Sequence, residues 1–98
     1  FSLPVVPNYA TNNAHMFYII CKDIALRTAL IDSLKKSNYH AVFHYLSLHA
    51  SDFYKDKHDG RDLNNSDKFS DCLVRLPMFY ELTVEDIKCI AENIKKVR

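Results

Sequence analysis

Glycine is almost absent from this chain: Gly60 is the only one in 98 residues. A loop that cradles a phosphate group needs several close backbone approaches, which glycine permits. A single glycine therefore argues against a phosphate-binding loop. No serine-centred nucleophile turn and no pair of carboxylates stands out either. The residues alone therefore do not predict a self-contained enzyme.

The number of cysteines is small and odd. The three cysteines, Cys21, Cys72 and Cys89, have no Cys-x-x-Cys spacing, whereas a disulfide framework needs a denser and even set. We therefore predict reduced thiols and a cytoplasmic protein. Cys72 and Cys89 lie on or beside apolar helix faces and away from cationic clusters. This predicts buried or half-buried thiols rather than nucleophiles.

An excess of charge of one sign is also missing. Thirteen Lys and Arg against twelve Asp and Glu give a net charge of +1, so neither nucleic acid nor a membrane is a predicted partner. No apolar run approaches the roughly 20 residues of a membrane span, and no secretory signal is visible. What is present, 48% hydrophobic and 26% charged residues, is typical of one globular domain.

The first half of the chain predicts a strand and a helix. Two prolines indicate an extended lead-in over residues 1–14. The short apolar stretch 15–21 favours a strand buried on both faces. Asp23 is a typical N-cap for a helix that continues to about Ser37. That helix has one apolar stripe, formed by Leu26, Leu30, Ile31 and Leu34.

The middle of the chain predicts a second strand, a loop and a second helix. Residues 40–45 are strand-like, and residues 50–65 form a long polar loop. Ser66 marks the start of a helix that stops before Pro77. A short extended piece over residues 78–80 follows. The apolar residues of this predicted helix are Phe69, Cys72, Leu73 and Leu76.

The last helix has the clearest start. Thr83 stands at the N-cap with Asp86 three residues later, close to a capping box, and Leu82 and Ile87 occupy the hydrophobic-staple positions. Apolar residues then recur at helical spacing toward a lysine-rich end. The alternation of strands and helices predicts an α+β fold, a small sheet with helices packed on it.

Histidine is the residue type that first suggests a metal site. His40 and His44 have the spacing of two zinc ligands on one helical turn. Residues 40–45, however, are strand-like, and positions four apart on a strand lie about 13 Å from each other. Two ligands of one zinc ion must each lie within about 2 Å of it. We therefore predict no metal site.

Aromatic residues are numerous, with six Tyr and six Phe, and most occur in adjacent groups. Packing of the core accounts for part of them. The remainder, together with the histidines and the long loop, predicts a surface that packs on something larger.

Three segments resemble a known family in the same order and spacing. They read Asn-Ala-His-Met-Phe-Tyr-Ile at residues 13–19, Phe-His-Tyr-Leu-Ser-Leu-His at 43–49 and Arg-Leu-Pro-Met-Phe-Tyr-Glu-Leu-Thr at 75–83. Together they resemble the C-terminal small domain of the DegT, DnrJ and StrS group of sugar-nucleotide aminotransferases. The resemblance runs from about Leu3 to Val97. Within the group it points to enzymes that act on dTDP-4-keto-6-deoxy sugars.

The resemblance implies a fold-type-I, pyridoxal-phosphate-dependent transaminase that works as a homodimer. A lysine of the family's large domain holds the cofactor, and an amino acid, usually glutamate, donates the amino group to the sugar nucleotide. Residues 15–98 would be the small domain, and residues 1–14 the lead-in from the large one. No segment here resembles the family's cofactor-lysine motif. We therefore expect this chain alone neither to bind the cofactor covalently nor to transaminate.

The resemblance also implies site residues. His44, Tyr45 and His49 match the family segment that lies near the substrate, and Ser47 stands where the family usually has proline. Asn13 and His15 are further candidates for lining the site. The alternative for all five is that they pack an interface between domains, and none of them is expected to be catalytic.

Two functions from different classes stay open at this point. The chain, which starts at Phe1, is either a piece of a longer aminotransferase or a stand-alone interaction module that uses the same fold. A piece would expose the apolar face that met the large domain, whereas a module would present a polar surface there.

Overall fold

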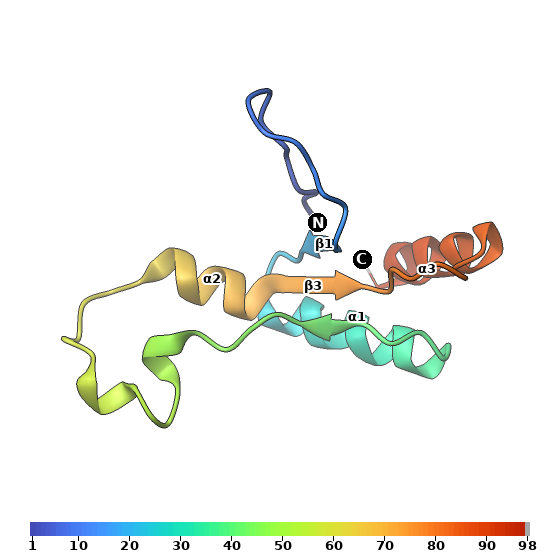
Figure 1. Ribbon diagram of the computed structural model, residues 1–98. Coiled ribbons are helices and arrows are strands. Elements are labelled where there is room, and N and C mark those ends of the chain that lie inside the picture. The colour runs from blue at the N-terminus through green and yellow to red at the C-terminus, as the bar shows by residue number, and fades with distance from the viewer. Residues whose placement is uncertain (98) are drawn as a thin grey trace.

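The computed structural model describes residues 1–97 and contains a three-stranded antiparallel sheet with three α-helices (Figure 1). The strands are β1 (Phe17–Ile20), β2 (Val42–Phe43) and β3 (Leu73–Leu76), in the spatial order β1-β3-β2. The helices are α1 (Ile24–Lys36), α2 (Asn64–Cys72) and α3 (Val84–Lys96). Two 3₁₀ turns, η1 (Leu48–Ala50) and η2 (Lys55–Lys57), precede α2.

The central strand β3 corrects the sequence-based prediction of a helix from Ser66 through Leu76. The helix α2 begins earlier, with Leu63 at its N-cap, and ends at Cys72. The next four residues are extended and pair with β1 on one side and β2 on the other. Val74 in the middle of β3 is fully buried. Pairing on both edges and complete burial stabilise an extended backbone here. These tertiary contacts therefore override the helical spacing of the apolar residues.

The first strand is shorter and less buried than predicted. It begins at Phe17 rather than residue 15, and of its four residues only Ile19 is buried, while Phe17 is 44% exposed. The cause is its place at the edge of the sheet, where a strand has one regular neighbour. Ser2 partly covers that edge, since it exchanges two backbone hydrogen bonds of 2.9 and 3.0 Å with Ile20. The second strand, predicted over residues 40–45, is also reduced to two residues.

The helix ends follow local signals. Asp23 Oδ1 accepts the Leu26 backbone N–H at 2.8 Å, as predicted for the N-cap of α1. At the other end Asn38 has φ 63° and the Tyr39 N–H donates to Leu34 O at 2.9 Å, which makes a Schellman ending. Thr83 and Asp86 form the capping box of α3. The predicted caps of the first and last helices are thus confirmed.

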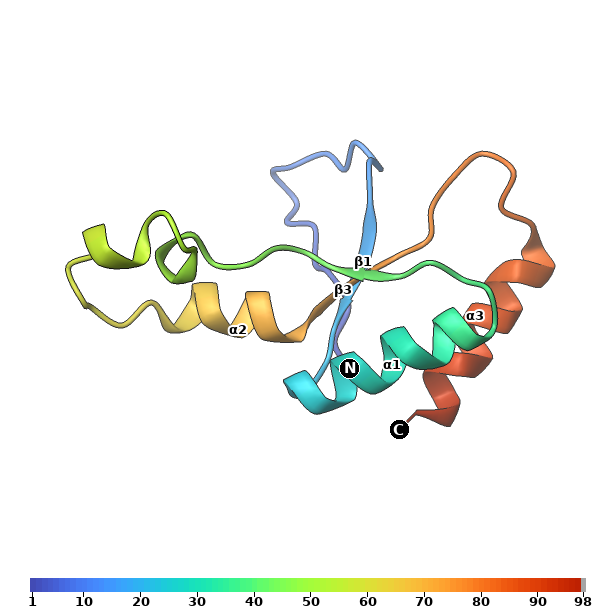
Figure 2. The same cartoon turned by 90° about the horizontal axis from the view of Figure 1, so that it is seen from below.

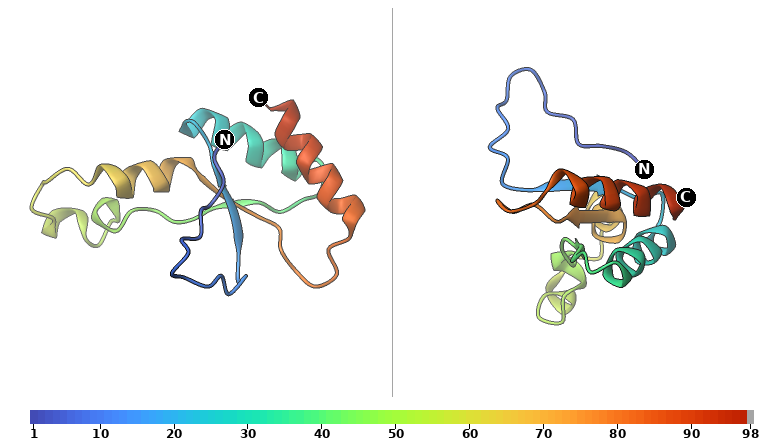
Figure 3. Two further views of the ribbon diagram at one scale, coloured as in Figure 1. Left: turned by 90° about the horizontal axis from the view of Figure 1, so that it is seen from above. Right: turned by 90° about the vertical axis from the view of Figure 1, so that its right-hand side faces the viewer.

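The core lies where α1 and α3 pack against the sheet (Figure 3). Leu30 and Leu34 of α1 are fully buried beside Val74 of β3, and Ile90 of α3 completes the contact. This arrangement confirms the predicted α+β fold, with helices packed on a small sheet. The remaining members of the core are Ile19, Cys21, Ala41 and Leu76.

Two segments extend away from this core, and the molecule measures 48 × 36 × 22 Å. Residues 3–16 form one loop, and residues 44–63, which we call the arm, form the other (Figures 1 and 2). The arm includes most of the predicted loop and both 3₁₀ turns, and it returns to the sheet along α2. Within residues 1–97, no helix combines the length and the apolar character needed to cross a bilayer.

Candidate functional site

The arm begins at two of the predicted site residues, directly after β2. The His44 and Tyr45 rings are in contact, with centroids 3.5 Å apart. Tyr45 is exposed, whereas Nδ1 of His44 is buried and has no hydrogen-bond partner within residues 1–97. A buried polar atom without a partner costs about 1–3 kcal/mol, and such atoms are rare in folded proteins. His44 therefore has an unused capacity for one hydrogen bond.

The third predicted residue, His49, lies in η1 and is held by the start of α2. Its Nε2 lies 2.8 Å from Asp67 Oδ1, and its ring centroid lies 5.1 Å from that of His58. The His58 Nε2 in turn lies 2.9 Å from the carbonyl oxygen of Arg61. Neither Asp67 nor His58 was singled out from the sequence, because nothing local indicates that η1, η2 and α2 meet.

The last two predicted residues form a separate pair. His15 Nδ1 lies 2.6 Å from Asn13 Oδ1, and both residues are exposed. They belong to the N-terminal loop, which extends in a different direction from the arm (Figures 1 and 3). The structure therefore brings His44, Tyr45 and His49 onto one arm but does not unite them with Asn13 and His15.

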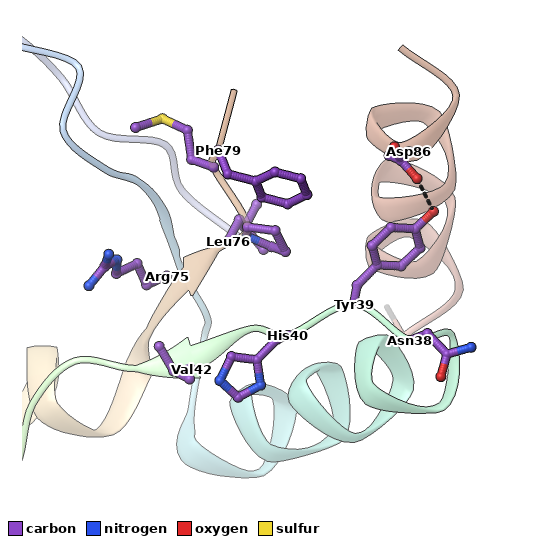
Figure 4. Close-up of a pocket in the computed structure, with 10 residues that line it drawn as sticks. Asn38, Tyr39, His40, Val42, Arg75, Leu76, Phe79 and Asp86 are labelled. Carbon is purple, nitrogen blue, oxygen red and sulfur yellow. Dashed lines mark hydrogen bonds between the residues drawn. The ribbon is translucent and has the colours of Figure 1, made fainter. Parts of the chain in front are cut away.

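A pocket of about 630 Å³ lies between the end of α1, the edge of the sheet and the start of α3 (Figure 4). The Tyr39 hydroxyl donates to Asp86 Oδ1 at 2.9 Å on one side of the pocket, and Phe79 lies on the other side. The hydrogen bond to Asp86 and burial raise the pKa of Tyr39 to about 12. Because the Tyr39 hydroxyl and the Asp86 carboxylate are hydrogen-bonded to each other, neither is a free reactive group in this pocket. Of the residues that line this pocket, Asp86 had a signal in the sequence through its capping role, and residues 75–79 lie in one of the segments that resemble the family.

An apolar groove of about 330 Å³ lies beside this pocket, between the sheet and α3. The two hollows share the segment 76–78 between them. Phe17, Met78 and Ile87 line the groove and are each about half exposed. The predicted staple residue Leu82 also lines it. An apolar surface of this kind is typical of a site for a protein partner.

The cysteines and lysines show no site chemistry. Cys21 and Cys72 are buried, and burial raises the pKa of the Cys21 thiol to about 11. Cys89 is exposed, which corrects the prediction of a buried or half-buried thiol at this position. All nine lysines are exposed. Residues 1–97 contain no cluster of His, Cys, Asp and Glu suited to a metal ion.

Comparison with known families assigns the chain. The model of the DegT/DnrJ/EryC1/StrS aminotransferase family matches residues 1–95. The chain belongs to this family. The match includes the N-terminal loop, the arm and α3, so all five predicted site residues lie within it.

Solved aminotransferases have the same fold over about a quarter of their length. TlmJ from Streptoalloteichus hindustanus matches 96% of this chain and 24% of its own, with TM-score 0.81 and 18% identity. PseC from Helicobacter pylori is an aminotransferase involved in the biosynthesis of pseudoaminic acid. It matches 85% of this chain and 23% of its own, with TM-score 0.73 and 21% identity. The putative sugar aminotransferase Spr1654 from Streptococcus pneumoniae, in its PMP form, matches 85% of this chain and 22% of its own, with TM-score 0.71 and 25% identity.

Proposed function

We propose that this chain is the small domain of a sugar-nucleotide aminotransferase. The whole enzyme would move an amino group from an amino acid, glutamate in our proposal, to a dTDP-4-keto-6-deoxy sugar, as in the formation of dTDP-4-amino-4,6-dideoxygalactose. The observation that carries the proposal is the family match over residues 1–95. Spr1654, described as a putative sugar aminotransferase, supports a sugar as the substrate class.

The arm supplies the substrate contacts in this proposal. Nδ1 of His44 is buried and has no hydrogen-bond partner within residues 1–97, and the ring of the exposed Tyr45 lies against the His44 ring. Both side chains suit the hydroxyl and phosphate groups of a sugar nucleotide. His49 lies further along the same arm, and Asn13 and His15 would join the site from the N-terminal loop. None of the five is assigned a catalytic step.

The cofactor in this proposal is pyridoxal phosphate, which supplies the amino-transfer chemistry when bound. No segment of this chain resembles the family's cofactor-lysine motif, so in this proposal no lysine of this chain holds the cofactor. The remainder of a longer protein would therefore hold it. The 98-residue chain alone is accordingly expected to be inactive.

The exposed apolar surface supports a larger protein around this domain. The chain spans about a quarter of the length of the aminotransferases that it matches. Phe17, Met78, Phe79 and Ile87 are exposed around the groove and the pocket, and Val5 and Tyr9 are exposed on the N-terminal loop. We propose that the large domain covers this surface and that residues 1–14 lead into it. We further propose that the enzyme is a cytoplasmic homodimer.

The experiment that tests this proposal is the intact mass of the native gene product after borohydride reduction. The expected result is a chain about four times longer that carries a reduced pyridoxyl group on a lysine outside these residues. That protein should aminate the dTDP-4-keto-6-deoxy sugar with glutamate. A native chain close to this length, with no reduced cofactor, would contradict the proposal and favour an interaction module.

A pair of variants of the full-length enzyme tests the role of the arm. His44→Gln and His49→Gln should raise the KM for the sugar nucleotide and leave the KM for the amino donor unchanged. His40→Gln is the matched control, because His40 is exposed and precedes β2 outside the arm. An equal effect of His40→Gln would contradict a specific role of the arm.

A further inference from the structure

Arg27 of α1 contacts the chain on both sides of the arm. Its Nη1 donates to the carbonyl oxygen of Ser70 in α2 at 3.2 Å, across 43 positions of the sequence. Its Cζ lies 5.2 Å from the centroid of the Phe43 ring in β2. Phe43 directly precedes the arm, and α2 directly follows it. One side chain therefore touches both the strand that enters the arm and the helix that leaves it.

Both contacts suit a positive charge. A guanidinium within about 6 Å of an aromatic ring centroid is attracted by the negative face of the ring. Ser70 lies in the last turn of α2, where carbonyl groups lack a partner within the helix and the helix dipole favours a cation. No carboxylate within residues 1–97 forms an ion pair with Arg27. The Phe43 ring and the Ser70 carbonyl are therefore the partners of its charge.

These contacts, rather than water, set the position of the guanidinium. Arg27 is half-buried, and its Nε is enclosed without a hydrogen-bond partner within residues 1–97. An arginine at a helix surface can instead extend into water, where each of its N–H groups finds an acceptor. The side chain gives up that solvation at Nε and keeps its contacts with Phe43 and Ser70. The two contacts therefore outweigh the loss of one hydrogen bond.

The arm has no buried residue of its own. Residues 44–63 are all exposed or half-buried, and the core consists of residues outside them. Segments with few buried apolar contacts have a low local stability, so their placement depends on the elements at their ends. The proposed site residues begin directly after Phe43, and His49 Nε2 lies 2.8 Å from Asp67 Oδ1 in α2. These residues therefore move with the two elements that Arg27 joins.

We propose that Arg27 is a positioning residue for the arm. By joining β2 to the end of α2, it fixes where His44 and Tyr45 lie relative to the sheet. It acts through Phe43 and Ser70 and does not itself touch the substrate. This inference rests on the proposed function for its substrate, whereas the restraint on the arm follows from the two contacts alone.

Kinetics of the full-length protein test this role. Arg27→Met keeps a long side chain and removes the charge and the donor groups. It should raise the KM for the sugar nucleotide roughly 10-fold and leave the KM for the amino donor unchanged, because the arm alone is misplaced. Arg27→Lys keeps a cation and a donor and should recover part of the loss. Lys35→Met is the matched control, because Lys35 is an exposed cation further along the same helix.

Amide hydrogen exchange separates this role from general stabilisation of the fold. In Arg27→Met, exchange should become faster in residues 42–72 and stay unchanged in α3. Phe43→Leu removes the aromatic face and should reproduce part of the effect. Because the two residues act through one contact, the double variant should be less impaired than the two separate effects combined.

Three results would overturn the inference. They are unchanged exchange in residues 42–72 of Arg27→Met, an equal acceleration in α3, and an equal rise in the KM for the sugar nucleotide in Lys35→Met. If the wild-type protein aminates no sugar nucleotide, the proposed function fails, and the exchange result still decides whether Arg27 holds the arm.

Discussion

Ser47 has backbone angles of φ −65° and ψ 137°. A proline ring fixes φ at about −65°, and this ψ is compatible with proline. Its N–H makes no hydrogen bond within residues 1–97, so a proline here would lose nothing. We predict that Ser47→Pro raises the free energy of unfolding by about 0.4–1 kcal/mol, because it restricts the unfolded chain. Urea denaturation measures the effect. Ser47 therefore has a backbone conformation that proline can also adopt.

The control for this prediction is a second serine in the same arm. Ser51 has a similar φ of −69°, but its N–H donates to Leu48 O at 3.0 Å. Ser51→Pro removes that hydrogen bond and should destabilise the protein instead. If both prolines had the same effect, the conformation of Ser47 would not be the reason.

The hydrogen bonds of Asp86 predict that the stability of the protein depends on pH. Its carboxylate accepts hydrogen bonds from the Thr83 hydroxyl, the Thr83 N–H and the Tyr39 hydroxyl, and these lower its pKa below the usual 3.8. A group whose pKa is lowered by folding stabilises the folded state above its unfolded pKa. That contribution is lost as the pH falls below 3.8 toward the lower folded value.

The measurement is urea denaturation of the wild type and Asp86→Asn at several pH values. The asparagine variant should be less stable at pH 7, and the difference should shrink as the pH falls below about 4. Glu85→Gln is the control, because Glu85 is exposed and its ion pair with Lys88 is long, at 3.9 Å. A difference between wild type and Asp86→Asn that does not change with pH would contradict this account.

At the scale of the elements, the end of α1 depends on one residue. Asn38 has φ 63°, a left-handed conformation that side chains with a Cβ adopt at a cost of about 1–2 kcal/mol. Asn38→Ala should therefore lower the free energy of unfolding by about 1 kcal/mol, whereas Asn38→Gly should not lower it. Lys36→Ala, two residues earlier and inside the helix, is the control. Thermal unfolding followed by circular dichroism distinguishes the three variants.

Both ends of α1 and the start of α3 were predictable from the sequence because their signals are local, whereas α2 begins and ends at other residues than predicted. Asp23 and Thr83 each bond a backbone N–H within one turn, and Asn38 follows the last helical residues directly. The strand β3 was not predictable in the same way. Its four residues share apolar spacing with a helix, and they become a strand only by pairing with residues 17–20 and 42–43. Non-local pairing, rather than propensity, decides such segments.

The candidate site shows the same division. His44, Tyr45 and His49 could be named because they lie in one short segment that resembles a family motif. Asp67 and His58 could not be named, because their contact with His49 depends on how the arm folds back along α2. Asn13 and His15 stay a prediction, since within residues 1–97 they form a pair of their own.

At the scale of the whole molecule, the apolar surface distinguishes a domain of a larger enzyme from a stand-alone module. One group of exposed apolar side chains lies on the segment that links β3 to α3, where Tyr80 is 98% exposed and Met78 and Phe79 are about half exposed. The apolar groove adjoins the same segment. A monomeric soluble protein rarely leaves an apolar surface of this kind uncovered.

We therefore predict that the 98-residue chain, folded by the criterion of circular dichroism, binds a hydrophobic dye and self-associates as its concentration rises. The full-length enzyme should bind much less dye per chain, because the proposed large domain would cover the surface. Met78→Gln with Phe79→Gln should reduce both effects, whereas Leu48→Gln, an exposed leucine on the arm, should change them little. Dye fluorescence and light scattering provide the two measurements. A chain that stays monomeric and binds no dye would contradict this prediction and favour a stand-alone binding module.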